Sequence, residues 1–208
     1  MMQARPRTRI VSLVLALLVG AAVATPAAAY DEWLWALNWN IIIPEGETSD
    51  FIKDTSYRGV SLEGRKWQGD NLTVGFMFGW NVLDQKLFTT QPIEGENASA
   101  DVTGTQYRYI NTYPVLAGFH MYMGSWGTTR LFLGAMGGGY VVERRVELGL
   151  FAQESQKWQW GVAPEIGVLL PFESTVGFVS ARYNYAFENG EDHPAHSYWS
   201  AQIGLGWN

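Results

Sequence analysis

The stretch of sequence that decides the fold is residues 71–82, NLTVGFMFGWNV. Its even positions, from Leu72 through Phe76 and Phe78 to Val82, carry bulky apolar side chains, whereas its odd positions are mostly small or polar. Side chains two residues apart point to the same face of a β-strand, so this alternation predicts a strand with one apolar face and one small or polar face.

The same alternation recurs along the chain with a new register in each stretch. Clear period-two patterns cover residues 33–43, 71–82, 112–121, 158–170, 179–187 and 199–207, and weaker ones cover residues 58–68 and 131–142. The sequence therefore predicts an all-β chain of eight antiparallel strands. An even strand number is typical of single-chain bacterial outer-membrane barrels.

The first 29 residues have the pattern of a secretory signal peptide. Arg5, Arg7 and Arg9 form a basic start, residues 10–24 are uncharged and mainly apolar, and residues 27–29 are alanines that suit a cleavage site. We therefore expect a signal peptide at residues 1–29 and an outer-membrane β-barrel domain at residues 30–208.

Composition excludes several classes of protein. The 14 Lys plus Arg residues include the three leader arginines, so the mature chain has 11 basic against 20 acidic side chains, which opposes nucleic-acid binding. Ten residues each of Trp, Tyr and Phe argue against disorder, and the absence of cysteine excludes a disulfide-stapled fold. The mature chain has no apolar run long enough for a membrane-spanning helix.

The bulky face of each strand decides which side of the barrel is apolar. It holds three to five large apolar residues, too many for a narrow lumen, so we expect it to face lipid while the small and polar face lines the interior. A secreted, soluble ligand-binding barrel of the lipocalin or avidin type is the alternative. We interpret the tryptophans near strand ends as an interfacial girdle. They are Trp33, Trp35, Trp80, Trp158, Trp160, Trp199 and Trp207.

Connections between the predicted strands alternate in length. Long polar segments are expected at residues 44–57, 84–105, 143–157 and 188–197, and short turns at residues 69–70, 124–127 and 171–174. This arrangement predicts an up-and-down meander with both termini in the periplasm and four extracellular loops.

These stretches resemble the small outer-membrane β-barrel family, which includes the OmpA transmembrane domain and OmpX. The resemblance rests on GVSLEGRKW at 59–67, residues 71–82, TYPVLAGFHMYMG at 112–124, GVAPEIGVLLP at 161–171, RYNYAF at 182–187 and IGLGW at 203–207. It implies a Gram-negative outer-membrane location, contact with membrane lipids and lipopolysaccharide, and recognition by the barrel-assembly machinery.

The sequence departs from the expected pattern in two ways. The family commonly ends on an aromatic residue, whereas here Trp207 is followed by Asn208. Pro114 and Pro164 each lack a backbone donor in a predicted strand, so we expect either a bulge at each or a later strand start.

The inward-facing charges are the candidate site. Glu63, Arg65, Glu165 and Arg182 are predicted to form an ion-pair cluster in the lumen, because buried charge requires pairing. The cluster is either structural or a gate. The leading hypothesis is a non-enzymatic membrane protein that acts through its surface loops, with an unknown surface partner. The alternative function is a narrow channel or transporter of ions or small hydrophobic molecules.

Catalysis and cofactors receive little support from the sequence. Some small barrels modify lipid A, but the candidate nucleophiles and bases Ser125, Ser197, His120, His193 and His196 show no convergent arrangement, so we expect no enzyme. Asp192, His193 and His196 form only a weak metal pattern. We expect no cofactor and no resident metal.

Overall fold

The computed structural model describes residues 33–95, 98–149, 151–172, 174–190 and 194–208. The predicted signal peptide and its cleavage site lie outside the described residues. No helix within these ranges is long and apolar enough to cross a membrane.

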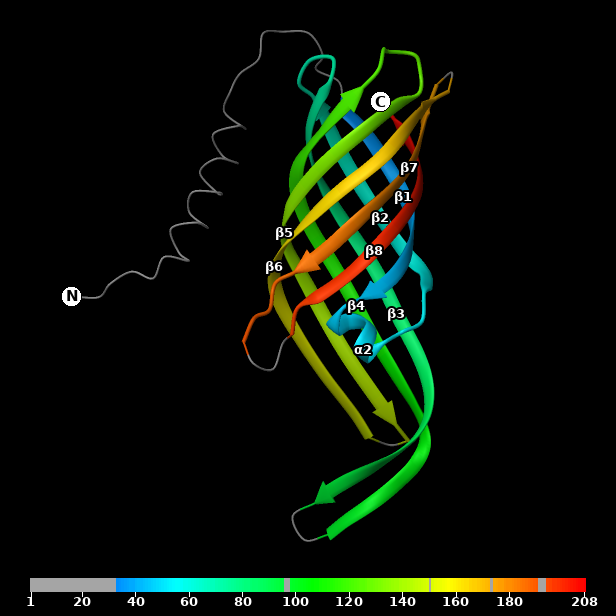
Figure 1. Cartoon of the computed structure of the whole chain (residues 1–208), viewed down its shortest axis with the longest axis vertical. Coiled ribbons are helices and arrows are strands. Elements are labelled where there is room, and N and C mark those ends of the chain that lie inside the picture. Colours follow the sequence, from blue (N-terminus) through cyan, green and yellow to red (C-terminus); the bar gives the residue numbers. More distant parts are fainter. Residues whose placement is uncertain (1–32, 96–97, 150, 173, 191–193) are drawn as a thin grey trace, which may run out of the picture.

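Eight antiparallel strands close into one barrel in chain order, with the first strand paired to the last (Figure 1). The elements are β1 (Trp33–Glu45), α2 (Glu47–Phe51), β2 (Ser56–Trp67), β3 (Leu72–Gly95), β4 (Ala98–Met123), β5 (Arg130–Leu148), β6 (Phe151–Pro171), β7 (Val176–Ala186) and β8 (His196–Trp207). This architecture confirms the predicted up-and-down barrel.

The two faces of each strand point as the alternation predicts. In β3, Phe78 projects outward with 49% of its surface exposed, whereas its neighbour Met77 points inward and is 2% exposed. Large exposed apolar side chains cover the outside of every strand, and the interior is packed with buried polar and aromatic groups. A soluble lipocalin-like barrel would have its apolar face inside, so that alternative is wrong.

Two segments expected as long loops are instead paired strands. β3 and β4 continue their ladder to Gly95 and Ala98, and β5 and β6 continue theirs to Leu148 and Phe151. The two hairpins extend beyond the other strands at one end of the barrel (Figure 1). Both faces of these hairpins are solvated if they project into water, so their sequences need not alternate between apolar and polar residues. Without that alternation the polar segments resemble loops, which explains the wrong expectation.

The two prolines are accommodated without bulges. β3 and β4 keep one register on both sides of Pro114, and β6 and β7 keep one register on both sides of Pro164. Each ladder is interrupted on the side that the missing N–H would face, but pairing resumes unchanged. Gly79 lies opposite Pro114 and leaves room for its ring. The expectation of a bulge or a later strand start is therefore wrong.

Candidate functional site

The four inward charges that the sequence singles out meet in the middle of the lumen. Arg65 and Glu63 from β2 are joined by a contact of 2.5 Å between Nη2 and Oε2. Arg182 from β7 approaches Glu165 from β6 at 2.8 Å and also contacts the Glu63 carboxylate. A fourth contact of 3.6 Å joins Arg65 to Glu165.

Strand register explains this meeting. Glu165 and Arg182 are direct cross-strand partners on β6 and β7, and Glu63 and Arg65 occupy consecutive inward positions of β2. All four side chains are buried. Two carboxylates balance two guanidiniums, so the cluster carries no net charge of its own. Unbalanced charge would be costly to bury at this depth.

Two further members of the cluster come from β4. His120 Nε2 lies 3.1 Å from Glu165 Oε2, and Tyr122 accepts a 2.8 Å hydrogen bond from Arg65 Nη1. The rings of Phe132 and Phe178 pack against the Arg65 guanidinium, with centroids at 4.9 and 5.0 Å. His120 lies on the polar face of residues 112–121, so the sequence predicts that it points inward. The sequence does not predict its contact with Glu165 of β6.

A second polar layer lies between the cluster and the extended hairpins. Asn40 donates to Asn81 at 3.1 Å, and Asn81 donates to the Tyr198 hydroxyl at 3.1 Å. On the other side of the lumen Tyr140 donates to Asn184 at 3.3 Å. All of these side chains are buried, so the polar interior is filled by hydrogen-bonded groups.

Helix α2 closes the lumen at the hairpin end. The hydroxyl of buried Thr48 lies 2.8 Å from His196 Nδ1 and accepts a 2.9 Å bond from the backbone N–H of Ser197. The other ring nitrogen of His196 lies 2.9 Å from the Thr112 hydroxyl. Ile52, at the end of the helix, is fully buried against the lumen residues. These contacts tie the β1–β2 connection to β4 and β8.

An aromatic group around Arg130 lies at the opposite end of the lumen. Its guanidinium lies 4.9 to 5.4 Å from the ring centroids of Trp67, Tyr122 and Trp126. Nη2 of Arg130 also donates to the Asp70 carbonyl and the Asn71 side chain, both at 2.7 Å. Trp67 is thus an interior tryptophan.

The cluster also contains a possible set of metal ligands. One ligand atom from each of Glu63, His120 and Glu165 lies within 4.8 Å of the others. Both carboxylates are already engaged by Arg65 and Arg182, whose guanidiniums would repel a cation. The arrangement is therefore suited to internal pairing.

The candidate hydrolase residues do not converge. Ser125 lies in the turn after β4, and His120 faces Glu165. The Ser197 hydroxyl donates to the Glu45 carbonyl, and His196 contacts threonines. Within the described ranges no serine hydroxyl is hydrogen-bonded to a histidine. His193, like Asp192, lies outside the described residues.

The predicted girdle tryptophans occupy outward positions toward the two ends of the barrel wall. Trp33, Trp35 and Trp207 lie where β1 begins and β8 ends, with Trp33 stacked on Trp35 at 5.9 Å. The others, Trp80, Trp158, Trp160 and Trp199, are exposed and lie toward the end that carries the hairpins. Trp39, absent from the predicted set, is also exposed and donates to the Tyr57 carbonyl at 2.8 Å.

Comparison with known proteins yields likeness in structure but not in sequence. No family model matches the chain, and no curated protein matches it. Neisserial surface protein A (NspA) superposes with a TM-score of 0.57 at 10% identity, over 86% of this chain and 99% of that one.

Two further solved structures are similar with lower TM-scores. Ail, the attachment invasion locus protein of Yersinia pestis, has a TM-score of 0.45 at 12% identity over 84% of this chain and 95% of its own. The N-terminal β-barrel domain of Pseudomonas aeruginosa OprF has a TM-score of 0.44 at 10% identity over 86% and 98%. The strand topology and the likeness to NspA show that the chain has the closed eight-stranded fold of the small outer-membrane β-barrels.

Proposed function

We propose that the chain is a non-enzymatic, integral outer-membrane barrel that is exported through a cleaved signal peptide and acts at the cell surface. Its apolar outer wall, bordered by tryptophans, suits contact with lipid and lipopolysaccharide, and its strand pattern suits recognition by the barrel-assembly machinery. In this orientation both ends of the barrel chain face the periplasm, and the hairpins and α2 face outward.

The observation that carries the proposal is the filling of the lumen by side chains. From the outer end to the inner end, the interior is occupied in turn by α2, the Asn40–Asn81–Tyr198 layer, the ion-pair cluster and the Arg130 aromatic group. An eight-stranded barrel has an interior just wide enough for such filling. A filled lumen with a charge-balanced ion-pair cluster favours a rigid scaffold that displays surface hairpins over a channel.

Single-channel recording in a planar bilayer tests this function. We expect the wild-type barrel, with insertion confirmed by a gel shift between unboiled and boiled samples, to show no steady conductance. Steady conductance that Glu165→Ala or Arg182→Ala alters, and that the exposed control Arg58→Ala leaves unchanged, would instead establish transport with the cluster as its gate.

A further inference from the structure

We propose that the outward face of the extended β3–β4 hairpin binds the sugar chain of an outer-leaflet glycolipid. The binding surface is an aromatic strip that consists of Phe88 of β3 and of Tyr107 and Tyr109 of β4. The inference rests on the outer-membrane orientation of the proposed function. It adds the part of the glycolipid that is bound and the residues that bind it.

Strand register places the three rings of the aromatic strip on one face. Phe78 is opposite Val115 in the barrel wall, and both side chains face outward. The same β3–β4 register continues into the hairpin, so even positions of β3 and odd positions of β4 still point outward there. Phe88, Tyr107 and Tyr109 therefore continue the surface of the lipid-facing wall.

The aromatic strip is exposed to an extent that calls for a contact. Phe88 is 79% exposed, the highest value among the large apolar side chains of the described residues. Tyr107 is 37% exposed, and its ring is nearly parallel to that of Tyr109, at 8° with the centroids 6.4 Å apart. Exposed apolar surface of this kind, rimmed by polar groups, typically marks an interaction site.

The apolar part of the wall ends below the strip, at Tyr113. Outward positions of β4 from Met123 to Val115 are apolar and exposed. The ten residue steps from Met123 to Tyr113 (123 − 113) rise about 26 Å, at about 3.4 Å per residue and a strand tilt of about 40°. The apolar band of outer-membrane barrels is about 25 Å tall, so Tyr113 stands at its outer border.

The height of the strip above this border selects the ligand. Tyr109, Tyr107 and the Phe88 partner Thr105 are four, six and eight residue steps beyond Tyr113 (113 − 109, 113 − 107 and 113 − 105). The rings therefore lie about 10, 16 and 21 Å above the border. A phospholipid headgroup layer is only about 5–8 Å thick. A headgroup of several sugars is needed to reach the strip.

The side chains around the strip suit sugars. Asp84 of β3 and Arg145 of β5 are the cross-strand neighbours of Tyr109, and the Lys86 ammonium lies 5.5 Å from the centroid of the Tyr107 ring. The C–H face of a sugar ring packs on an aromatic ring, while its hydroxyls bond to carboxylate and guanidinium groups at the edge. Lys86 also suits a phosphate or carboxylate group on the sugar chain.

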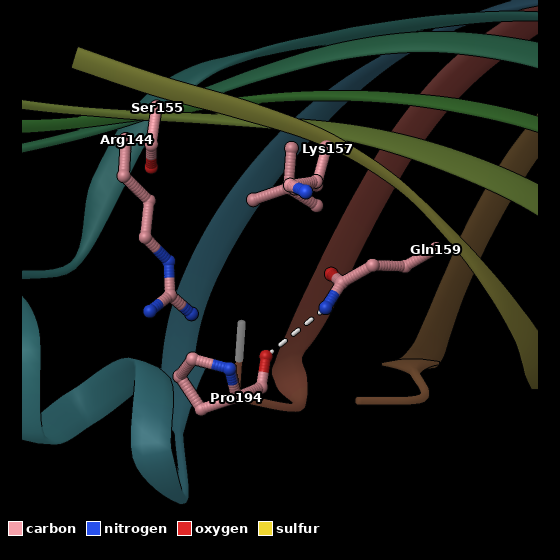
Figure 2. Close-up of a pocket in the computed structure, with 6 residues that line it drawn as sticks. Arg144, Ser155, Lys157, Gln159 and Pro194 are labelled. Carbon is pink, nitrogen blue, oxygen red and sulfur yellow. Dashed lines mark hydrogen bonds between the residues drawn. The ribbon is translucent and has the colours of Figure 1, made fainter. Parts of the chain in front are cut away.

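A glycolipid is favoured over other occupants because the wall below already holds its acyl chains. Lipid bound along Phe78 brings its own headgroup to the strip at high effective concentration. The inner face of the extended strands is engaged by the chain itself. Gln159 donates to the Pro194 carbonyl at 3.0 Å (Figure 2), and Arg108 donates to the Phe51 carbonyl at 3.0 Å.

Hydroxyl-radical footprinting of the mature barrel in nanodiscs measures how exposed each aromatic side chain is to water. The nanodiscs contain phosphatidylcholine alone, phosphatidylcholine with lipid A, or phosphatidylcholine with lipopolysaccharide that carries core sugars on the same lipid A. We expect oxidation of Phe88 and Tyr107 to slow about threefold or more in the third nanodisc only, because the core sugars cover the strip.

Phe172, in the turn after β6, is the matched control. It is 58% exposed at the other end of the barrel, where sugars of the other leaflet surround it without an aromatic strip. The proposal is overturned if Phe172 slows equally or if the strip does not slow. It is also overturned if the strip is protected in phosphatidylcholine alone and more so with two barrels in each nanodisc, since a second copy then covers it.

Phe78 separates failure of this inference from failure of the proposed function. Its oxidation should be slow in all three nanodiscs, because lipid covers it. Fast oxidation of Phe78 would contradict the outer-membrane barrel itself, whereas a shielded Phe78 beside an unprotected strip overturns only the glycolipid site.

Variants of the strip give an independent measurement. Lipopolysaccharide with core sugars should raise the temperature at which the unboiled barrel loses its gel shift, relative to lipid A, because it binds only the folded protein. Phe88→Ser and Tyr107→Ser should lose most of this rise, and Phe172→Ser should keep it. An equal rise in all four proteins would overturn the proposal.

Discussion

Removing Arg182 should destabilise the barrel far more than removing an exposed arginine. Arg182 is buried and contacts Glu63 and Glu165, so the change Arg182→Gln leaves two carboxylates facing the single guanidinium of Arg65. The cluster then holds one uncompensated negative charge. Breaking a buried ion pair in this way costs about 3–5 kcal/mol.

An exposed ion pair of similar length provides the control. Arg58 and Asp84 lie 3.1 Å apart with side chains that are 62% and 44% exposed. Solvent screens such a pair, so Arg58→Gln should cost at most about 1 kcal/mol. Urea unfolding in lipid vesicles, monitored by tryptophan fluorescence, measures the free energy of unfolding of both variants. The comparison holds if the slope of that free energy against urea concentration is the same as in the wild type.

The double variant E63Q/R182Q tests whether charge balance is the cause. It leaves Arg65 and Glu165, which are already 3.6 Å apart, as a neutral pair. The double variant should therefore lose less stability than the sum of the two single variants, by about 1–3 kcal/mol. The reasoning is refuted if the two losses add, or if Arg182→Gln costs no more than Arg58→Gln.

Three further changes test other parts of the structure. Thr48→Val removes the two hydrogen bonds that join α2 to the His196 ring and to the backbone N–H of Ser197. Amide hydrogen exchange in residues 47–52 should therefore become about tenfold faster. Unchanged exchange would show that other contacts hold α2 in place. Gly139→Val should cost about 1–3 kcal/mol in urea unfolding, because Trp158 packs over Gly139, and an unchanged midpoint would contradict this packing. The described residues within 89–104 pair only with one another. Replacing 89–104 by a two-residue Asn-Gly turn should leave the gel shift intact, whereas failure to fold would show that this hairpin is part of the scaffold.

The fold could be predicted from the sequence because a barrel wall places consecutive residues in opposite environments. Phe78 faces outward and Met77 faces the lumen, as the alternation of residues 71–82 predicts. The extended hairpins were missed because strands that are solvated on both faces carry no such constraint. Helix α2 was missed because it has five residues, too few for a helical period to emerge.

Only part of the ion-pair cluster could be predicted from the sequence. Alternation places Glu63, Glu165 and Arg182 on inward faces, and the cost of isolated charge implies that they pair. Alternation does not give the stagger between strands, which decides that His120 of β4 reaches Glu165 and that Tyr122 reaches Arg65.

The central claim is that the apolar face of the strands meets lipid, and the chain's lack of cysteine makes a direct test available. Spin labels at Phe78→Cys and Met77→Cys, in the barrel reconstituted into vesicles, would report accessibility to dissolved oxygen and to a water-soluble nickel complex. The account predicts that the label at position 78 is relaxed strongly by oxygen and weakly by nickel, and that the label at position 77 is shielded from both. Strong relaxation of the position 78 label by nickel would contradict the account.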